Sequence, residues 1–289
     1  MDGRTAALGE TALTAVLWGT SFPIIAVGLG TGVDPVTFAF LRFALAAPLF
    51  LALTRVMKRR VGALLRDRAV WLIAAFNAVG FLCQFEGQSY TDPSSAALLV
   101  NLATVFTAVA SAGLLKERFG KIKAFGVALA MVGTVLVTTR GDLALVTGGE
   151  ALGDSFYLLA AFTWTGYMIY DKKLTDERKW DAVAVSAAIV TLTAVLMAPA
   201  LVLAKGYAVP ATALEIAAYM AVFNTVVPWV FYQLGLQFLT ATASAVVLML
   251  EIVTALLISV AFLGQAMDAV STVGSASILV SIYMVSRRG

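Results

Sequence analysis

The stretch "FNAVGFLCQFEGQSY", residues Phe76–Tyr90, has a second version later in the chain, "FNTVVPWVFYQLGLQF", residues Phe223–Phe238. Both begin with Phe-Asn inside an apolar run, and both are followed by a run of small residues. Further correspondences extend the match: Ser94–Ala97 with Ala241–Ser244, Thr107-Ala108 with Thr254-Ala255, and Trp18-Gly19 with Trp164-Thr165-Gly166. The sequence therefore predicts two related halves joined near residues 140–152.

Composition assigns both halves to the membrane. The chain has 289 residues, of which 61% are hydrophobic and 13% charged, and its mean hydropathy is +0.92. Soluble domains are about half apolar and about a quarter charged. A soluble fold could not bury so much apolar surface, so the composition predicts a polytopic membrane protein.

The scarcity of reactive side chains excludes several kinds of chemistry. The chain has no His, and Cys83 is its single Cys. An internal disulfide is therefore excluded, and a zinc site is not expected. No phosphate-binding loop of the Walker type occurs, so ATP is not the direct energy source. We expect no cofactor and no metal, and we interpret the apolar run behind Arg4 as a retained span rather than a signal peptide.

The apolar runs predict ten transmembrane helices, because a bilayer core of about 30 Å requires about 20 apolar residues per helix. Asp34-Pro35 and Asp92-Pro93 are helix-start signals before two of them. The expected spans are 10–29, 35–54, 69–90, 94–115, 120–139, 152–170, 182–204, 212–236, 241–263 and 267–286.

The basic residues predict the orientation of these spans. With the N-terminus inside, all of the twenty Lys and Arg except Arg42, Arg140 and Lys205 fall on the cytoplasmic side. This agreement is strong for the first seven spans and weaker for the last three, whose connections carry no Lys or Arg. We expect a bacterial inner-membrane protein with both termini cytoplasmic. The pI near 9.0 then requires no nucleic-acid partner.

Five spans in each half is an odd number, so the two halves enter the membrane from opposite sides. Inverted repeats of this kind enclose substrate sites in secondary transporters, although duplication can also build a simple scaffold. The predicted fold is an all-α membrane protein of ten transmembrane helices. It consists of two inverted five-helix repeats, residues 1–140 and 141–289, around a central cavity.

Several short motifs resemble a known family: Leu17-Trp18-Gly19-Thr20-Ser21-Phe22, Leu41-Arg42-Phe43, Ser94–Leu99, Phe106-Thr107-Ala108 and Lys116-Glu117. With these motifs the chain resembles the EamA branch of the drug/metabolite transporter superfamily over nearly its whole length. The resemblance implies ten helices, cytoplasmic termini and export or exchange of small metabolites, most commonly amino acids and their relatives. The family often has Pro at two places where this chain has Val105 and Ile252.

Three charged residues lie within the expected spans, where charge is rare and costly. Glu251, near the middle of the ninth span, is a candidate proton carrier or amine partner, or else a buried acid that is protonated or paired with Arg42. Arg42 is a candidate clamp for a substrate carboxylate, but we favour a structural pair with Glu86. Glu86 lies close to the outer face, where solvent can reach it.

Amide and aromatic side chains give the remaining candidates for substrate binding. A carboxamide within the membrane must face protein or a wet cavity, and Trp residues deep in a span are too far from the interfaces for an aromatic belt. Helix–helix hydrogen bonding and packing are equal alternatives for each. The candidates are Asn77, Gln84, Asn101, Asn224, Trp18, Phe22, Trp164, Tyr167, Trp229 and Tyr232.

Two prolines predict bends. Pro23 leaves the carbonyl of Gly19 without its helical donor, and Pro228 does the same to Asn224. We expect Trp18–Pro23 to face the cavity, with Gly19, Pro23 and Pro228 as gating hinges.

The leading hypothesis is a secondary transporter that moves a small amphipathic metabolite, most simply an amino acid or a related compound, by alternating access. Its partners are the small molecule and membrane lipid, and it acts as a monomer or a homodimer. The alternatives are a lipid-modifying membrane enzyme, which Glu86, Asp92 and Asp268 in one pocket would favour, and a transporter of nucleotide sugars or other phosphorylated substrates. Small residues in the fifth and tenth spans mark close packing, either at the periphery or in a dimer.

Overall fold

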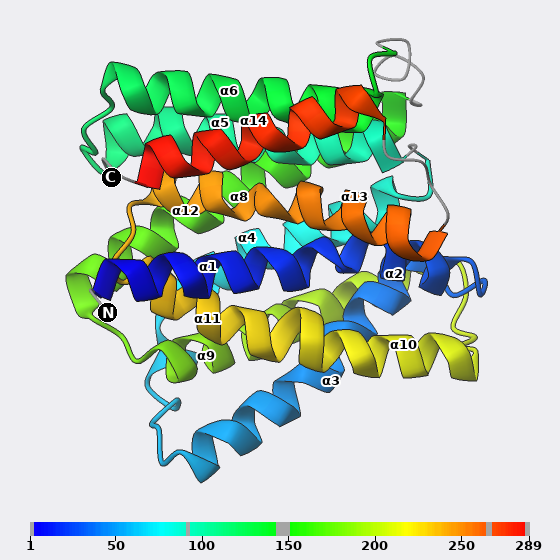
Figure 1. Ribbon diagram of the computed structural model, residues 1–289. Coiled ribbons are helices and arrows are strands. Elements are labelled where there is room, and N and C mark those ends of the chain that lie inside the picture. Colours follow the sequence, from blue (N-terminus) through cyan, green and yellow to red (C-terminus); the bar gives the residue numbers. More distant parts are fainter. Residues whose placement is uncertain (1–2, 91–92, 143–150, 264–267, 287–289) are drawn as a thin grey trace.

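The computed structural model describes residues 3–90, 93–142, 151–263 and 268–286, with the side chains of 93–98, 259 and 262–263 left aside. Most of the labelled helices lie roughly along one direction, with α3 slanting across them, and both ends of the described chain lie at the same end of the bundle (Figure 1). The helices of the first half are α1 (Gly3–Gly19), α2 (Ser21–Leu29), α3 (Pro35–Val56), η1 (Leu64–Arg66), α4 (Arg68–Gly87), α5 (Pro93–Leu114) and α6 (Lys121–Thr139). Those of the second half are α8 (Ala151–Arg178), α9 (Ala182–Met197), η2 (Ala198–Leu203), α10 (Ala211–Ala221), the π-helical turn η3 (Val222–Val226), α11 (Val227–Leu236), α12 (Ala241–Leu248), α13 (Leu250–Leu263) and α14 (Ala269–Ser286).

Each of the ten expected spans is occupied by one of these helices or by two or three consecutive ones. By length and apolarity, eight helical stretches of the described chain are fit to cross a membrane, and Leu99–Leu114 is a shorter apolar helix. The chain is an all-helical membrane protein. α8 is outside this apolar set, and it is the helix that carries Trp164, Tyr167 and Asp171.

Short polar residues begin several of the helices as the sequence indicates. The carboxylate of Asp34 accepts a hydrogen bond from the backbone N–H of Thr37 at 3.0 Å, directly before Pro35. Asp181 caps α9 in the same way through the N–H of Ala184 at 3.0 Å. The expected cap at Asp92 lies outside the described residues.

Three spans are interrupted near their middles. The first breaks at Thr20, between α1 and α2, and the eighth contains the π turn η3 directly before Pro228. The ninth breaks at Met249, between α12 and α13, although Ile252 stands where the family often has Pro. Helix breaks and π turns are common at functional sites because they re-aim side chains and free backbone groups.

The packing of the helices has a two-fold pattern. α8 packs between α4 and α5, and α1 packs in the same way between α11 and the α12–α13 pair. The contacts of α3 with α9 and of α6 with α14 join equivalent helices of the two halves. If each helix is replaced by its counterpart in the other half, the contacts of α8 with α4 and α5 become those of α1 with α11 and the α12–α13 pair. The α3–α9 and α6–α14 contacts each remain the same. The inverted repeat stays a prediction that this pattern supports.

α6 and α14 pack directly against each other, and small residues make this possible. A Cβ at Gly133 would lie 2.6 Å from the carbonyl oxygen of Gly274, and one at Gly274 would lie 2.7 Å from that of Gly133. The small residues of the fifth and tenth spans therefore form a helix–helix contact within the chain.

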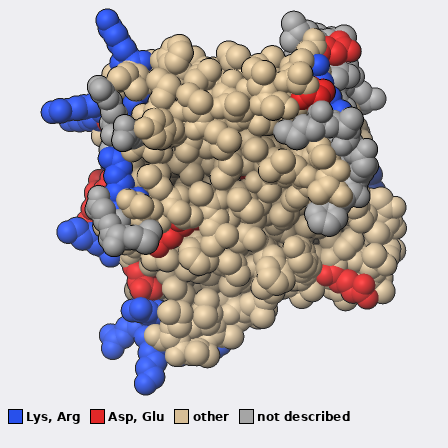
Figure 2. All heavy atoms as spheres, in the orientation of Figure 1, with Lys and Arg blue, Asp and Glu red and all other residues tan. Residues whose placement is uncertain are grey.

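Charged side chains of the described chain gather at the ends of the bundle. Figure 2 shows Lys and Arg concentrated at the end that holds both termini, while the middle of this face is almost free of charge. We call this end the basic end. It is the side that the sequence predicts to be cytoplasmic.

Candidate functional site

A pocket lies inside the bundle, with about 770 Å³ of empty space including its mouth. Its walls are mostly aromatic, with a few polar groups and two charged side chains. The lining residues are Trp18, Ser21, Phe22, Arg42, Asn77, Phe81, Gln84, Val100, Asn101, Ala103, Thr104, Trp164, Tyr167, Met168, Trp229, Tyr232, Ala245, Leu248 and Glu251.

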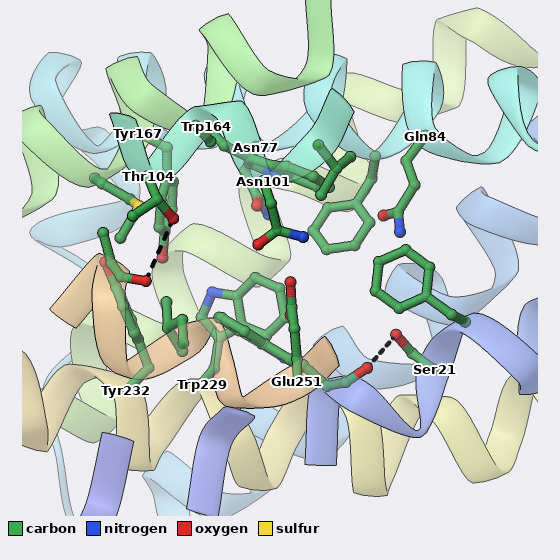
Figure 3. Close-up of a pocket in the computed structure, with 18 of the residues that line it drawn as sticks. Ser21, Asn77, Gln84, Asn101, Thr104, Trp164, Tyr167, Trp229, Tyr232 and Glu251 are labelled. Atoms are coloured by element: carbon green, nitrogen blue, oxygen red, sulfur yellow. Dashed lines mark hydrogen bonds between the residues drawn. The ribbon is translucent and has the colours of Figure 1, made fainter. Parts of the chain in front are cut away.

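Most of the residues predicted for the site meet here. Trp18, Phe22, Asn77, Gln84, Asn101, Trp164, Tyr167, Trp229, Tyr232, Arg42 and Glu251 all line the pocket, whereas Asn224, Glu86, Gly19, Pro23 and Pro228 do not. Figure 3 shows Tyr167 and Tyr232 at one end of the pocket and Gln84 and Ser21 at the other. The roles of these residues stay predictions.

The expectation that the whole segment Trp18–Pro23 faces the cavity is wrong in part. Trp18 and Phe22, one helical turn apart, line the central pocket together with Ser21. Thr20 and Pro23 instead line a second, shallower pocket with Val27, between α2, α10 and α13. A helix turns by about 100° per residue, so one segment cannot present six consecutive side chains to one cavity.

Several lining residues were not predicted from the sequence. Phe81 lies one turn from both Asn77 and Gln84 on α4, and Thr104 lies one turn from Asn101 on α5. Helical spacing from the predicted amides could have found both. Met168 and the small residues of the lining carry no polar signal that would mark them in an apolar sequence.

Arg42 is buried, with 1% of its surface exposed, and it does not pair with Glu86. Its Nε donates to the hydroxyl of Thr225 at 2.9 Å, and its Nη2 donates to the backbone oxygen of Asn224 at 2.6 Å. The guanidinium also lies 4.8 Å from the ring centre of Phe81. The predicted Arg42–Glu86 pair is wrong, because Arg42 faces the π turn of the eighth span.

Glu86 belongs to a separate cluster at the end of the molecule opposite the basic end. Its carboxylate accepts a hydrogen bond from the Tyr90 hydroxyl at 3.0 Å and lies 3.7 Å from Nζ of Lys205. Asp268 pairs with Arg140 instead, at 3.9 Å, and Asp92 lies outside the described residues. Glu86 and Asp268 therefore engage different partners, and the described chain does not gather them into one acidic site.

Asn224 connects the break in the first span to the π turn of the eighth. Its side-chain Nδ2 donates to the backbone oxygen of Leu17 at 2.5 Å and to the hydroxyl of Thr20 at 2.8 Å. Its own backbone oxygen accepts from Nε1 of Trp18 at 3.2 Å as well as from Arg42. The carbonyl that Pro228 deprives of its helical donor is thus satisfied by two side chains, as an intramembrane carbonyl requires.

Glu251 enters the pocket from the start of α13, beside the break in the first span. Its carboxyl group is hydrogen-bonded to Asn101 of α5. Gly19 packs closely on the backbone of Glu251, because a Cβ at Gly19 would lie 2.5 Å from the backbone oxygen of Glu251. No Lys or Arg of the described chain forms an ion pair with Glu251. The pairing with Arg42 that we considered is absent from the described contacts.

The aromatic rings of the lining pack against one another while they face the pocket. Trp18 lies 5.1 Å from Trp229 and 5.7 Å from Tyr232, and Phe81 lies 5.4 Å from Trp164, all measured between ring centres. Packing between helices and lining a cavity were alternatives in the sequence, but here the same rings do both. Such rings offer an apolar surface and a negative face for a cation.

The amides differ in how completely they are bonded. Nδ2 of Asn77 donates to the hydroxyl of Thr193 on α9 at 3.0 Å, which ties α4 to α9. Gln84 is buried, and its Oε1 has no hydrogen-bond partner in the described chain. Gln84 and Glu251 therefore keep accepting capacity toward the pocket.

The sequence matches the EamA-like transporter family over residues 8–139 and again over residues 151–287. It belongs to the EamA-like transporter family. As a member, it is a multi-pass membrane transporter. An "Uncharacterized transporter" of Archaeoglobus fulgidus is 28% identical to this EamA-like protein over 286 residues, which cover 96% of each chain.

Another relative and a solved structure are also similar to the chain. A "Probable terminal-alkyne amino-acid exporter" of Streptantibioticus cattleyicolor is 26% identical over 283 residues, covering 96% of this EamA-like chain and 92% of the relative. A crystal structure with 18% sequence identity covers 98% of this chain and 99% of its own, with a TM-score of 0.82. At that identity the likeness supports the fold alone.

Proposed function

We propose that the protein is a secondary transporter that exports or exchanges a small amphipathic metabolite, an amino acid or a related compound, across the bacterial cytoplasmic membrane. The observation that carries the proposal is the central pocket. It places a carboxyl group, a partly bonded guanidinium and several amides within aromatic walls. Such a lining suits a molecule with a polar head and an apolar body.

The two charges of the pocket support a substrate that itself carries both signs. Glu251 is bonded to an uncharged amide and can accept a substrate amine. Nη1 of Arg42 is buried without a hydrogen-bond partner in the described chain, while Nε and Nη2 are already engaged. This one unbonded nitrogen can donate to a substrate carboxylate. A phosphorylated substrate would require several cations, and Arg42 is the one Lys or Arg among the described lining residues.

Alternating access is the mechanism that this arrangement supports. The breaks at Thr20, at Val222–Val226 and at Met249 lie beside the pocket. Asn224 hydrogen-bonds Thr20 and so links the first two breaks, and Gly19 packs on Glu251 next to the third. The two separate family matches and the two-fold packing pattern favour the inverted repeat on which such a cycle depends. The Lys- and Arg-rich end holding both termini favours a cytoplasmic location for that end.

Transport by the purified protein in liposomes tests the proposal. Vesicles are loaded with one unlabelled metabolite at a time, and uptake of the labelled compound by exchange is measured across a panel of amino acids, their amides, amines and sugar phosphates. We expect exchange for amphipathic amino acids and none for sugar phosphates. Trp18→Ala and Trp164→Ala should lower exchange with little change in yield, because they remove pocket walls. Exchange of sugar phosphates alone would contradict the proposal.

A further inference from the structure

Asp171 is a second buried carboxyl group, and it lies next to the pocket rather than in it. It is on α8, one helical turn beyond Tyr167, and its surface is 0% exposed. Tyr167 lines the pocket, and α8 continues from Asp171 through Lys172 to Arg178 at the basic end. Asp171 therefore lies between the pocket and the end of the molecule that we place in the cytoplasm.

The carboxylate of Asp171 is held by an uncharged partner. Nε2 of Gln233, on α11, donates to its Oδ2 at 2.6 Å. Lys172, the next residue, directs its Nζ elsewhere, to Oδ1 of Asp176 at 2.5 Å and to the backbone oxygen of Leu236 at 3.1 Å. No ion pair of the described chain neutralises Asp171.

The polar groups around Asp171 are incompletely bonded. The hydroxyls of Tyr167 and Thr175 lie close enough to Asp171 to donate weakly to it, and its Oδ1 has no other partner within the described chain. Buried polar atoms bonded so weakly are uncommon in stable cores and point to a role. An ionisable group at such a place within a membrane protein is a functional candidate by default.

The same contacts join α8 to α11 across one end of the pocket. The Asp171–Gln233 and Lys172–Leu236 hydrogen bonds lie on the basic side of Tyr167 and Tyr232, whose ring centres are 6.0 Å apart. Figure 3 shows these two tyrosines together at one end of the pocket. Opening the pocket toward the basic end requires α8 and α11 to separate, which breaks these contacts.

We infer that Asp171 is a proton-binding residue of the transport cycle, and that its ionised form latches α8 to α11 and closes the pocket toward the basic end. The inference rests on the proposed function. An ionised carboxylate accepts a charge-assisted hydrogen bond, which is about twice as strong as a neutral one. Binding a proton from water at the basic end weakens the bond to Gln233, and its release to the same water restores it.

Few other titratable groups face Asp171. Those beside it are Tyr167 and Lys172 on its own helix and Tyr232 on α11. The neighbouring helices contribute apolar residues to the buried cluster around Tyr167 and Tyr232, namely Val70, Ile73 and Ala74 of α4, Val185, Ala188, Ile189 and Leu192 of α9, and Ala245 of α12. Thr107 of α5, which bonds Met168, is uncharged. Glu251 lines the pocket itself, so a test must separate its titration from that of Asp171.

The accessibility of a pocket position tests the latch without any substrate. The full-length protein carries Cys83→Ser, Glu251→Gln and Thr104→Cys, so that the single thiol lies in the pocket lining. A membrane-impermeant maleimide is applied at the basic end of vesicles, and the labelling rate is compared with and without Asp171→Asn at each pH. The ratio of the two labelling rates, with and without Asp171→Asn, is taken at each pH, so that the pH dependence of the thiol's own reactivity cancels.

We expect Asp171→Asn to raise the labelling rate about tenfold at alkaline pH, with the ratio falling toward one at acidic pH, where Asp171 itself is neutral. Glu177→Gln is the matched control, because Glu177 is exposed on the same helix and, unlike Asp176, does not bind Lys172 of the latch; it should leave the rate unchanged. If Asp171→Asn fails to fold, Gln233→Met removes the donor and should raise labelling in the same way.

A ratio of one at every pH, or an equal increase in Glu177→Gln, would overturn the inference. The assay is independent of transport. A pH-dependent latch in a protein for which no substrate is found would therefore uphold this inference while the proposed function fails. Exchange of amino acids by a protein with pH-independent labelling would overturn only this inference.

Discussion

The backbone oxygen of Asn224 lies 2.6 Å from Nη2 of Arg42, so a guanidinium of the second span supplies the donor that Pro228 removes from the eighth. A single charged side chain thereby holds together two helices from different halves of the protein. Arg42 also donates to the hydroxyl of Thr225, in the same π turn. In this structure, Arg42 therefore supplies hydrogen-bond donors to the π turn of the eighth span.

Arg42→Met is expected to destabilise the protein by about 3 kcal/mol, because it removes two hydrogen bonds from a charged donor and leaves buried acceptors unpaired. Thermal unfolding in detergent, followed by loss of monodisperse protein, measures this. Pro228→Ala restores a backbone donor in the same turn. The cost of Arg42→Met should therefore be smaller by about 1 kcal/mol in the Pro228→Ala background. Strictly additive effects would show that the two positions are not coupled in this way.

The sequence predicts the spans and many pocket residues for one physical reason. A polar or large aromatic side chain deep in a membrane-spanning helix is expected to face the protein interior rather than lipid. Glu251, Asn101 and Trp164 could therefore be recognised as interior residues from the sequence alone. The helix-start signal at Asp34 and the free carbonyl at Asn224 are equally local. Each depends on residues within one turn.

Partners across helices could not be predicted in the same way. Depth in the membrane places Arg42 and Glu86 at similar levels, but it does not fix the face on which each side chain lies. Asp171 was missed because it is followed by Lys172-Lys173 and Asp176, a pattern typical of a solvated helix end. Its buried side chain bonds Gln233 of α11, a contact between helices that no local pattern in α8 reveals.

Gly19→Ala is expected to disturb the contact between the first span and α13. The added methyl group would lie 2.5 Å from the backbone oxygen of Glu251 and 2.8 Å from Cβ of Thr254, so one of the two helices must shift. We expect a loss of about 2 kcal/mol in stability. Gly9→Ala, on the same helix with no heavy atom within 4 Å, is the control and should be neutral or slightly stabilising. Equal melting temperatures for the two variants would contradict the close approach.

Gly133→Ala should weaken the packing of α6 on α14 within one chain. The new Cβ would lie 2.6 Å from the backbone oxygen of Gly274, which cannot move without its helix, and a loss of about 2 kcal/mol is expected. Gly113→Ala in α5 meets no heavy atom within 4 Å and serves as the matched control. Thermal unfolding at several protein concentrations measures both effects. A destabilisation that vanishes on dilution would assign this surface to a contact between two copies.

Glu251→Gln is expected to separate substrate exchange from proton coupling. Glutamine keeps the size of the side chain and a carbonyl oxygen for Asn101, but it cannot bind and release a proton. In liposomes, exchange of the substrate at equal pH on both sides should weaken, because the substrate amine keeps an acceptor oxygen but loses the opposite charge, whereas the response of net transport to a pH gradient should be lost altogether. Glu215→Gln, an exposed position on α10, is the control and should keep that response. If the response to the gradient survives in Glu251→Gln, the proton is carried elsewhere, and Asp171→Asn then becomes the variant to compare.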